Sequence, residues 1–213
     1  MSLRFLALGD SYTIGEAVPA AERWPVQLAG LLAARGVTVE PPRIIATTGW
    51  TTDELAAALD ELSGTDAAPR GPYDLVSLLI GVNDQYRDRD VEAYRAGFDA
   101  LLQRAVGFAG GDPSRVLVLS IPDWGVMPFA EGRDRGQIAA AIDQFNRAAH
   151  HDAMAAGARW VDVTPISRRA ATDPSLVAGD GLHPAGRMYA YWAELALPHA
   201  WAALGRGPLV PSS

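Results

Sequence analysis

The sequence from Leu3 to Ser11 is LRFLALGDS, and this stretch decides the fold class. Residues 3–8 form a short and almost continuous apolar run, which is typical of a β-strand buried on both faces of a sheet. Gly9 and Asp10 then turn the chain, so that Ser11 follows the carboxyl end of this strand. In open α/β sheets, ligands bind outside the carboxyl ends of the strands. Ser11 is therefore a candidate nucleophile, provided that a base and oxyanion donors reach it from other segments.

Apolar runs alternate with amphipathic stretches along the rest of the chain. The runs that predict strands are 3–8, 43–47, 73–80, 115–121 and 159–163. The stretches that predict helices are 24–35, one beginning at Thr52, 91–106, 135–156 and 185–204. Because parallel strands need crossover helices, the pattern predicts an α/β fold of three layers around a mostly parallel sheet. We expect a single domain over residues 1–204 and a flexible tail over residues 205–213.

Composition excludes several classes of protein. The 213 residues include no cysteine, which excludes disulfides, thiolate catalysis and cysteine-ligated zinc. All 18 basic residues are arginine, which excludes a Schiff-base lysine and a P-loop lysine. The net charge of −7 argues against nucleic acid as a partner. No apolar run approaches the roughly 20 residues of a membrane span, and no secretory signal precedes residue 3, so we expect a cytoplasmic protein.

A candidate base and its orienting acid lie near the other end of the chain, in Asp180-Gly181-Leu182-His183-Pro184. A turn at Gly181 would bring the Asp180 carboxylate to the imidazole of His183 and stabilise its protonated form. The alternative is an ordinary Asp-Gly turn followed by the start of a helix.

Candidate oxyanion donors follow the second and third predicted strands. Gly49 offers a backbone N–H that a ligand can approach closely, and Asn83 offers a side-chain amide. Each segment alone is equally consistent with an ordinary strand-exit turn. Four such segments at the edge where a doubly wound sheet binds ligands are much less consistent with chance.

Together these segments resemble the SGNH hydrolases, also called GDSL esterases and lipases. The blocks are Gly9-Asp10-Ser11, Gly49, Gly81-Val82-Asn83-Asp84 and Asp180 to His183, in the family's order. The resemblance implies a five-stranded α/β/α sandwich of flavodoxin-like order. It further implies Ser11 as nucleophile, His183 as general base and acid, and Asp180 as orienting carboxylate. The implied oxyanion hole combines the N–H groups of Ser11 and Gly49 with the Asn83 amide, and no metal or cofactor is needed.

The sequence departs from the family pattern in two places. Tyr12 stands where the family name has leucine, a variation that the family tolerates. Thr47 and Thr48 stand where an asparagine often precedes the glycine of the second block, so the support of the Gly49 loop is left open.

Apolar residues near these blocks are candidates for a substrate pocket: Trp50, Trp124, Met127 and Phe129. The alternative is that the loop after the fourth strand forms a small core of its own. We expect Asp10 and Asp84 to brace their turns, and the His150-His151-Asp152 cluster to be a solvated helix face rather than a metal site. Glu16 and Arg23 are expected to be exposed to solvent.

The sequence therefore predicts a serine esterase that hydrolyses small or short-chain carboxylic esters. Thioesters, lysophospholipids and acetylated carbohydrates remain alternative substrates, since a fold does not fix a substrate. A catalytically silent, flavodoxin-like binding scaffold is the rival from another class. The oligomeric state is not indicated by the sequence.

Overall fold

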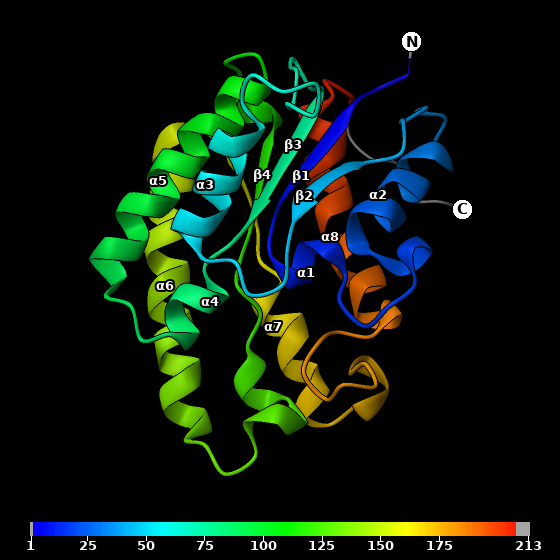
Figure 1. Ribbon diagram of the computed structural model, residues 1–213. Helices are drawn as coiled ribbons and strands as arrows, with labels where there is room; N and C mark the ends of the chain where they lie inside the picture. The colour runs from blue at the N-terminus through cyan, green and yellow to red at the C-terminus, as the bar shows by residue number, and fades with distance from the viewer. Residues whose placement is uncertain (1, 208–213) are drawn as a thin grey trace.

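The computed structural model describes residues 2–207, and its centre is a five-stranded parallel sheet (Figure 1). The strands coincide with the five apolar runs, with β1 ending one residue beyond the first: β1 Phe5–Gly9, β2 Arg43–Ala46, β3 Leu75–Leu79, β4 Val116–Leu119 and β5 Arg159–Val161. Their order is β2-β1-β3-β4-β5, the flavodoxin-like order. The predicted α/β class, strand number and strand order are confirmed.

Helices cover both faces of the sheet, which makes the three predicted layers. In Figure 1, α3 (Thr52–Leu62), α5 (Val91–Phe108) and α6 (Arg135–Ala156) lie on one side. On the other side α2 (Trp24–Ala33) packs along α8 (Gly186–Ala203). The shorter helices are α1 (Ser11–Ile14), α4 (Val82–Tyr86) and α7 (Thr164–Ser167). None of the helices in the described part of the chain is long and apolar enough to cross a membrane.

The direction of the winding changes between β1 and β3, and this topological switch point opens a crevice at the carboxyl ends of the strands. Gly9 pairs with Ala46 of β2 and with Leu79 of β3, so the three strands end level with one another. A Cβ atom on Gly9 would collide with the Leu79 carbonyl oxygen and with Thr13, so only glycine allows this close approach. The segments that follow β1, β2 and β3 therefore leave the sheet side by side.

Two segments need comment: the one that follows β3 and the C-terminal tail. The segment after β3, for which an ordinary strand-exit turn was the alternative interpretation, forms the short helix α4. The predicted flexible tail, residues 205–213, lies mostly outside the described residues.

Candidate active site

One cavity of about 160 Å³ brings together residues from five distant segments. Ser11, Gly49, Asn83 and His183 all line it, so the predicted nucleophile, the predicted base and all three predicted oxyanion residues share a single space. Asp180 lies behind His183, outside the lining. The four motif blocks thus converge at the switch point between β1 and β3.

The Ser11 turn is fixed by Asp10, as predicted. The Asp10 side chain caps α1 by accepting a hydrogen bond from the backbone N–H of Tyr12, at 3.0 Å. Burial raises the pKa of Asp10 to about 8; the Tyr12 hydrogen bond opposes this rise and the nearby Asp84 carboxylate adds to it. Ser11 is the first residue of α1, where a backbone N–H has no partner within the helix.

Asp180 and His183 form a tight pair. The Nδ1 atom of His183 lies 2.6 Å from an Asp180 carboxylate oxygen. The other carboxylate oxygen accepts hydrogen bonds from the backbone N–H groups of Leu182 and His183, each at 2.9 Å. Burial would raise the pKa of Asp180, but these three hydrogen bonds outweigh it and hold the pKa below its ordinary value. The carboxylate is therefore ionised, and it directs Nε2, the other imidazole nitrogen, away from itself.

The His183 ring is also held by aromatic packing. The ring of Tyr12 lies 5.6 Å from that of His183 and 6.0 Å from that of Trp192, measured between centroids. His183 and Tyr12 are both buried. The residue next to Ser11 thereby positions the base that is predicted to serve Ser11.

The loop that carries Gly49 is supported by α4. Asn83 donates a hydrogen bond from Nδ2 to the carbonyl oxygen of Trp50 at 2.8 Å, and Arg87 donates one to the carbonyl oxygen of Gly49 at 2.7 Å. Thr48 also donates a hydrogen bond to Glu16. Gly49 has φ 87°, in the left-handed region that favours glycine. The Gly49 loop, which lacks the asparagine that often precedes this glycine in the family, is therefore supported by α4 and the residue that follows it.

Asp84 ties α4 to the start of α3, which agrees with its predicted bracing role. Its carboxylate accepts hydrogen bonds from the Thr52 backbone N–H at 3.0 Å and from the Thr52 hydroxyl at 2.8 Å. Arg89 lies 3.4 Å away. Burial raises the pKa of Asp84, although the Thr52 hydrogen bonds and the Arg89 charge oppose the rise.

Two of the four predicted pocket residues line the cavity, and two do not. Trp124 and Phe129 line it, together with Tyr86 of α4. Met127 is fully buried instead, because the short 3₁₀ helices Trp124–Val126 and Pro128–Ala130 turn it into the core. Trp50 does not line the cavity either: it is partly buried against the core, and its contribution is the carbonyl oxygen that Asn83 binds. Met127 and Trp50 therefore do not belong to the lining of this cavity.

The comparisons with known proteins agree with this geometry. The model of the GDSL-like Lipase/Acylhydrolase family matches residues 7–191. The chain belongs to this family. It is a carboxylic ester hydrolase, and the resemblance seen in the motif blocks is confirmed. No curated protein matches the chain.

Several solved structures share the fold of this GDSL-like hydrolase. TesA is 20% identical, with a TM-score of 0.70 over 94% of this chain and 99% of its own. The psychrotrophic esterase EstA from Pseudoalteromonas sp. is 16% identical, with a TM-score of 0.69 over 96% of this chain and all of its own. Axe2, an acetylxylan esterase from Geobacillus stearothermophilus, is 18% identical, with a TM-score of 0.66 over 99% of this chain and 97% of its own.

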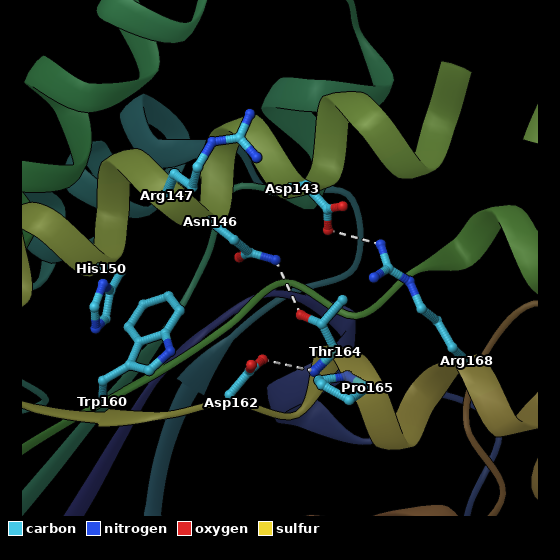
Figure 2. A pocket seen from close by; sticks show the side chains of 9 residues that line it. All are labelled: Asp143, Asn146, Arg147, His150, Trp160, Asp162, Thr164, Pro165 and Arg168. Atoms are coloured by element: carbon cyan, nitrogen blue, oxygen red, sulfur yellow. Dashed lines mark hydrogen bonds and ion pairs between the residues drawn. The ribbon is translucent and has the colours of Figure 1, made fainter. Parts of the chain in front are cut away.

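A wider cavity of about 420 Å³ in this GDSL-like hydrolase lies away from the motif residues (Figure 2). It is bordered by α6, β5 and α7, and neither Ser11 nor His183 lines it. Three of its charged groups are already engaged, since Arg168 pairs with Asp143 at 2.7 Å and Asp162 accepts a hydrogen bond from the Thr164 N–H. Its larger volume would favour this cavity as the active site, whereas the predicted catalytic residues lie in the smaller one.

The residues set aside on sequence grounds have local partners. Asp152 pairs with Arg95 at 2.6 Å, and the neighbouring His151 is exposed. Within residues 2–207, no three His, Cys, Asp or Glu side chains gather so that they could hold a metal ion. Glu16 and Arg23 were expected in solvent, but both are half-buried, and the Arg23 side chain packs against Gly15.

Sequence reasoning missed Tyr86, Arg87 and Leu182. Tyr86 and Arg87 follow from the third motif block once α4 is known to be helical: Tyr86 lies one turn after Asn83, and Arg87 is the residue that caps the end of the helix. Leu182 lines the cavity from within the Asp180–His183 turn.

Proposed function

We propose that this chain is a serine esterase that cleaves short-chain carboxylic esters through an acyl-enzyme on Ser11. The observation that carries the proposal is the shared cavity of Ser11, Gly49, Asn83 and His183, with Asp180 hydrogen bonded to Nδ1 of His183. A serine hydroxyl, an oriented imidazole and several N–H donors around one space are the parts that acyl transfer needs.

In the first half-reaction, the Ser11 hydroxyl attacks the ester carbonyl and His183 takes its proton through Nε2. Asp180 stabilises the imidazolium that forms. The negative charge on the carbonyl oxygen is bound by the backbone N–H groups of Ser11 and Gly49 and by the Asn83 amide. When the intermediate collapses, His183 returns the proton to the leaving alcohol, and the acyl group stays on Ser11.

In the second half-reaction, His183 removes a proton from water, which attacks the acyl-enzyme at the same carbonyl carbon. The same donors bind the oxyanion, and the proton then returns to the Ser11 oxygen. The products are the carboxylic acid and the free enzyme.

The size of the cavity supports a small acyl group. Its volume of about 160 Å³ is that of about five water molecules in the liquid, and lies below the roughly 300–1,000 Å³ of sites for drug-sized ligands. Axe2 acts on acetylxylan, an ester of a two-carbon acid, on the same fold. Short-chain esters are therefore the substrates that we expect.

The test is the hydrolysis of p-nitrophenyl esters from acetate to palmitate by the wild type, Ser11→Ala and His183→Ala. We expect each variant to lose at least about 10³ in turnover. A fluorophosphonate probe should label the wild type on Ser11 and leave Ser11→Ala unlabelled; a phosphonate, monoethylphosphonate, inhibits EstA. Absence of both Ser11-dependent turnover and labelling would favour a silent scaffold and overturn the proposal.

A further inference from the structure

Three aromatic rings close one end of the catalytic cavity. Tyr86, Trp124 and Phe129 form a triangle, with ring centroids 5.3 Å apart for Tyr86 and Trp124 and about 6 Å apart for the other two pairs. Trp124 is buried and is anchored by a hydrogen bond from Nε1 to Gln85 at 2.7 Å. Tyr86 and Phe129 are 41% and 43% exposed, although both are large and apolar. Something other than burial must therefore hold these two rings.

Arg133 is placed to do so. Its guanidinium carbon lies 5.2 Å, 5.3 Å and 5.5 Å from the ring centroids of Tyr86, Trp124 and Phe129, within the range of a cation–π interaction for each. It also donates a hydrogen bond to the Tyr86 hydroxyl at 3.2 Å. Among the ion pairs of the described residues, none involves Arg133, so its charge serves the rings rather than a carboxylate.

A second cavity lies directly behind this wall. It measures about 240 Å³, and Tyr86 and Trp124 line both it and the catalytic cavity. Arg133, Gln137 and Ile138 belong to its lining. The two rings, with Arg133 over them, therefore separate a small catalytic cavity from a further space that could extend it.

We propose that Arg133 is a specificity-determining residue, which holds Tyr86, Trp124 and Phe129 as the end wall of the catalytic cavity and thereby restricts the acyl group to a short chain. This inference rests on the proposed esterase function. Without Arg133, Tyr86 loses both its cation and its hydrogen-bond partner and can swing outward. The acyl chain then continues into the space behind, and the two cavities together reach the size of sites for larger ligands.

The acyl group, rather than the alcohol, faces this wall. In the tetrahedral intermediate the oxyanion points to Gly49 and Asn83, and the leaving alcohol must face His183, which protonates it. The remaining substituent is the acyl group. Helix α4 carries both Asn83 and Tyr86, and both line the cavity, so in our proposal the acyl group extends from the Asn83 side toward the ring of Tyr86.

The experiment compares Arg133→Ala, Tyr86→Ala and Arg135→Ala with the wild type on p-nitrophenyl esters of two to twelve acyl carbons. We expect the ratio of kcat/KM for octanoate to that for acetate to rise at least about tenfold in Arg133→Ala and in Tyr86→Ala. Arg135 is exposed and lies two residues from Arg133, so Arg135→Ala removes the same charge and should keep the wild-type ratio. Arg133→Ala and Tyr86→Ala open the same wall. The variant that combines both changes should therefore have an octanoate-to-acetate ratio only slightly higher than that of Tyr86→Ala.

A second series varies the alcohol at a fixed acetyl group. Suppose that the wild type hydrolyses p-nitrophenyl acetate and that this activity depends on Ser11. An acyl-chain preference unchanged in both Arg133→Ala and Tyr86→Ala would then overturn the proposed role of the aromatic wall, while the proposed esterase function would hold. A shift confined to the alcohol series would overturn the acyl assignment. A wild type without Ser11-dependent turnover on any ester would instead overturn the proposed function itself.

Discussion

At the scale of single residues, Asn83 combines an observed hydrogen bond with a proposed catalytic role. One N–H of its amide is directed at the Trp50 carbonyl oxygen at 2.8 Å, which fixes the orientation of the amide. The second N–H is the one that we propose to bind the oxyanion. We expect Asn83→Ala to lower kcat by roughly 10²–10³ with a much smaller change in KM, because an oxyanion exists only after attack.

The control for Asn83 is Arg87→Ala, which removes the neighbouring hydrogen bond to the Gly49 carbonyl oxygen but no donor to the oxyanion. Its loss of kcat should be clearly smaller. Steady-state kinetics on p-nitrophenyl acetate gives both values. Undiminished turnover in Asn83→Ala would contradict the oxyanion role.

Asp10 carries a second prediction at this scale, for stability against pH. Its pKa is about 8 in the folded chain and near its ordinary value of 3.8 in the unfolded chain, so folding takes up a proton between these pH values. The free energy of unfolding therefore falls as the pH rises through this window, by up to about 1.4 kcal/mol per pH unit from this group. Asp10→Asn, which can still accept the Tyr12 hydrogen bond, should show a shallower fall.

Urea unfolding of the wild type and Asp10→Asn at pH 5, 6, 7 and 8 measures this difference directly. Other groups titrate in both proteins and cancel in the comparison. Parallel pH dependences would mean that Asp10 is ionised in the folded chain.

At the scale of elements, Asp84 ties α4, which carries the proposed oxyanion donor Asn83, to the start of α3. Replacing Asp84 with alanine leaves the buried Thr52 N–H and hydroxyl without their acceptor, which costs about 1–3 kcal/mol. We expect Asp84→Ala to lower the free energy of unfolding by this amount and to lower kcat as well, since α4 carries Asn83.

The matched change is Asp53→Ala, which removes an acid that pairs with the same Arg89 but is largely exposed. An exposed ion pair contributes less than about 1 kcal/mol. Urea unfolding and kinetics of the two variants separate the alternatives: equal effects would show that Asp84 acts only through Arg89.

The elements also show how far the sequence predicts the structure. The strands could be predicted because each lies in a short, almost continuous apolar run, and the long helices because their apolar spacing extends over several turns. Helix α4 could not, since five residues are too short to show a period, and Tyr86 was missed with it. Met127 lies between two short 3₁₀ helices, and a loop punctuated by Pro and Gly has no repeat that would tell inward from outward side chains.

At the scale of the whole molecule, the cavity joins the two ends of the chain. Ser11 follows the first strand, whereas His183 precedes the last helix, and Tyr12 packs between His183 and Trp192 of α8. The motif blocks predicted that these ends meet. The aromatic contacts that hold them together could not be predicted, because they depend on how α8 is rotated against the sheet.

Substitution of Trp192 tests whether the packing of α8 against Tyr12 helps to position His183. It is fully buried, with its ring 5.1 Å from Tyr189 and 6.0 Å from Tyr12 between centroids. Replacing a buried tryptophan with alanine costs about 3–5 kcal/mol, through lost burial and the cavity left behind. We expect Trp192→Ala to lower the free energy of unfolding by this amount, measured in urea. Its kcat should fall too, even under conditions where the variant is fully folded, because Tyr12 loses the support through which it positions His183.

Trp192→Phe is the sharper variant, because it keeps an aromatic ring beside Tyr12. The indole Nε1 of Trp192 makes no hydrogen bond within the described residues, so phenylalanine leaves no partner unsatisfied. It should cost less stability than alanine and retain most of kcat. If Trp192→Ala instead kept wild-type kcat while losing stability, the packing of α8 would stabilise the fold without positioning the base, and the Asp180 pair alone would suffice to orient His183.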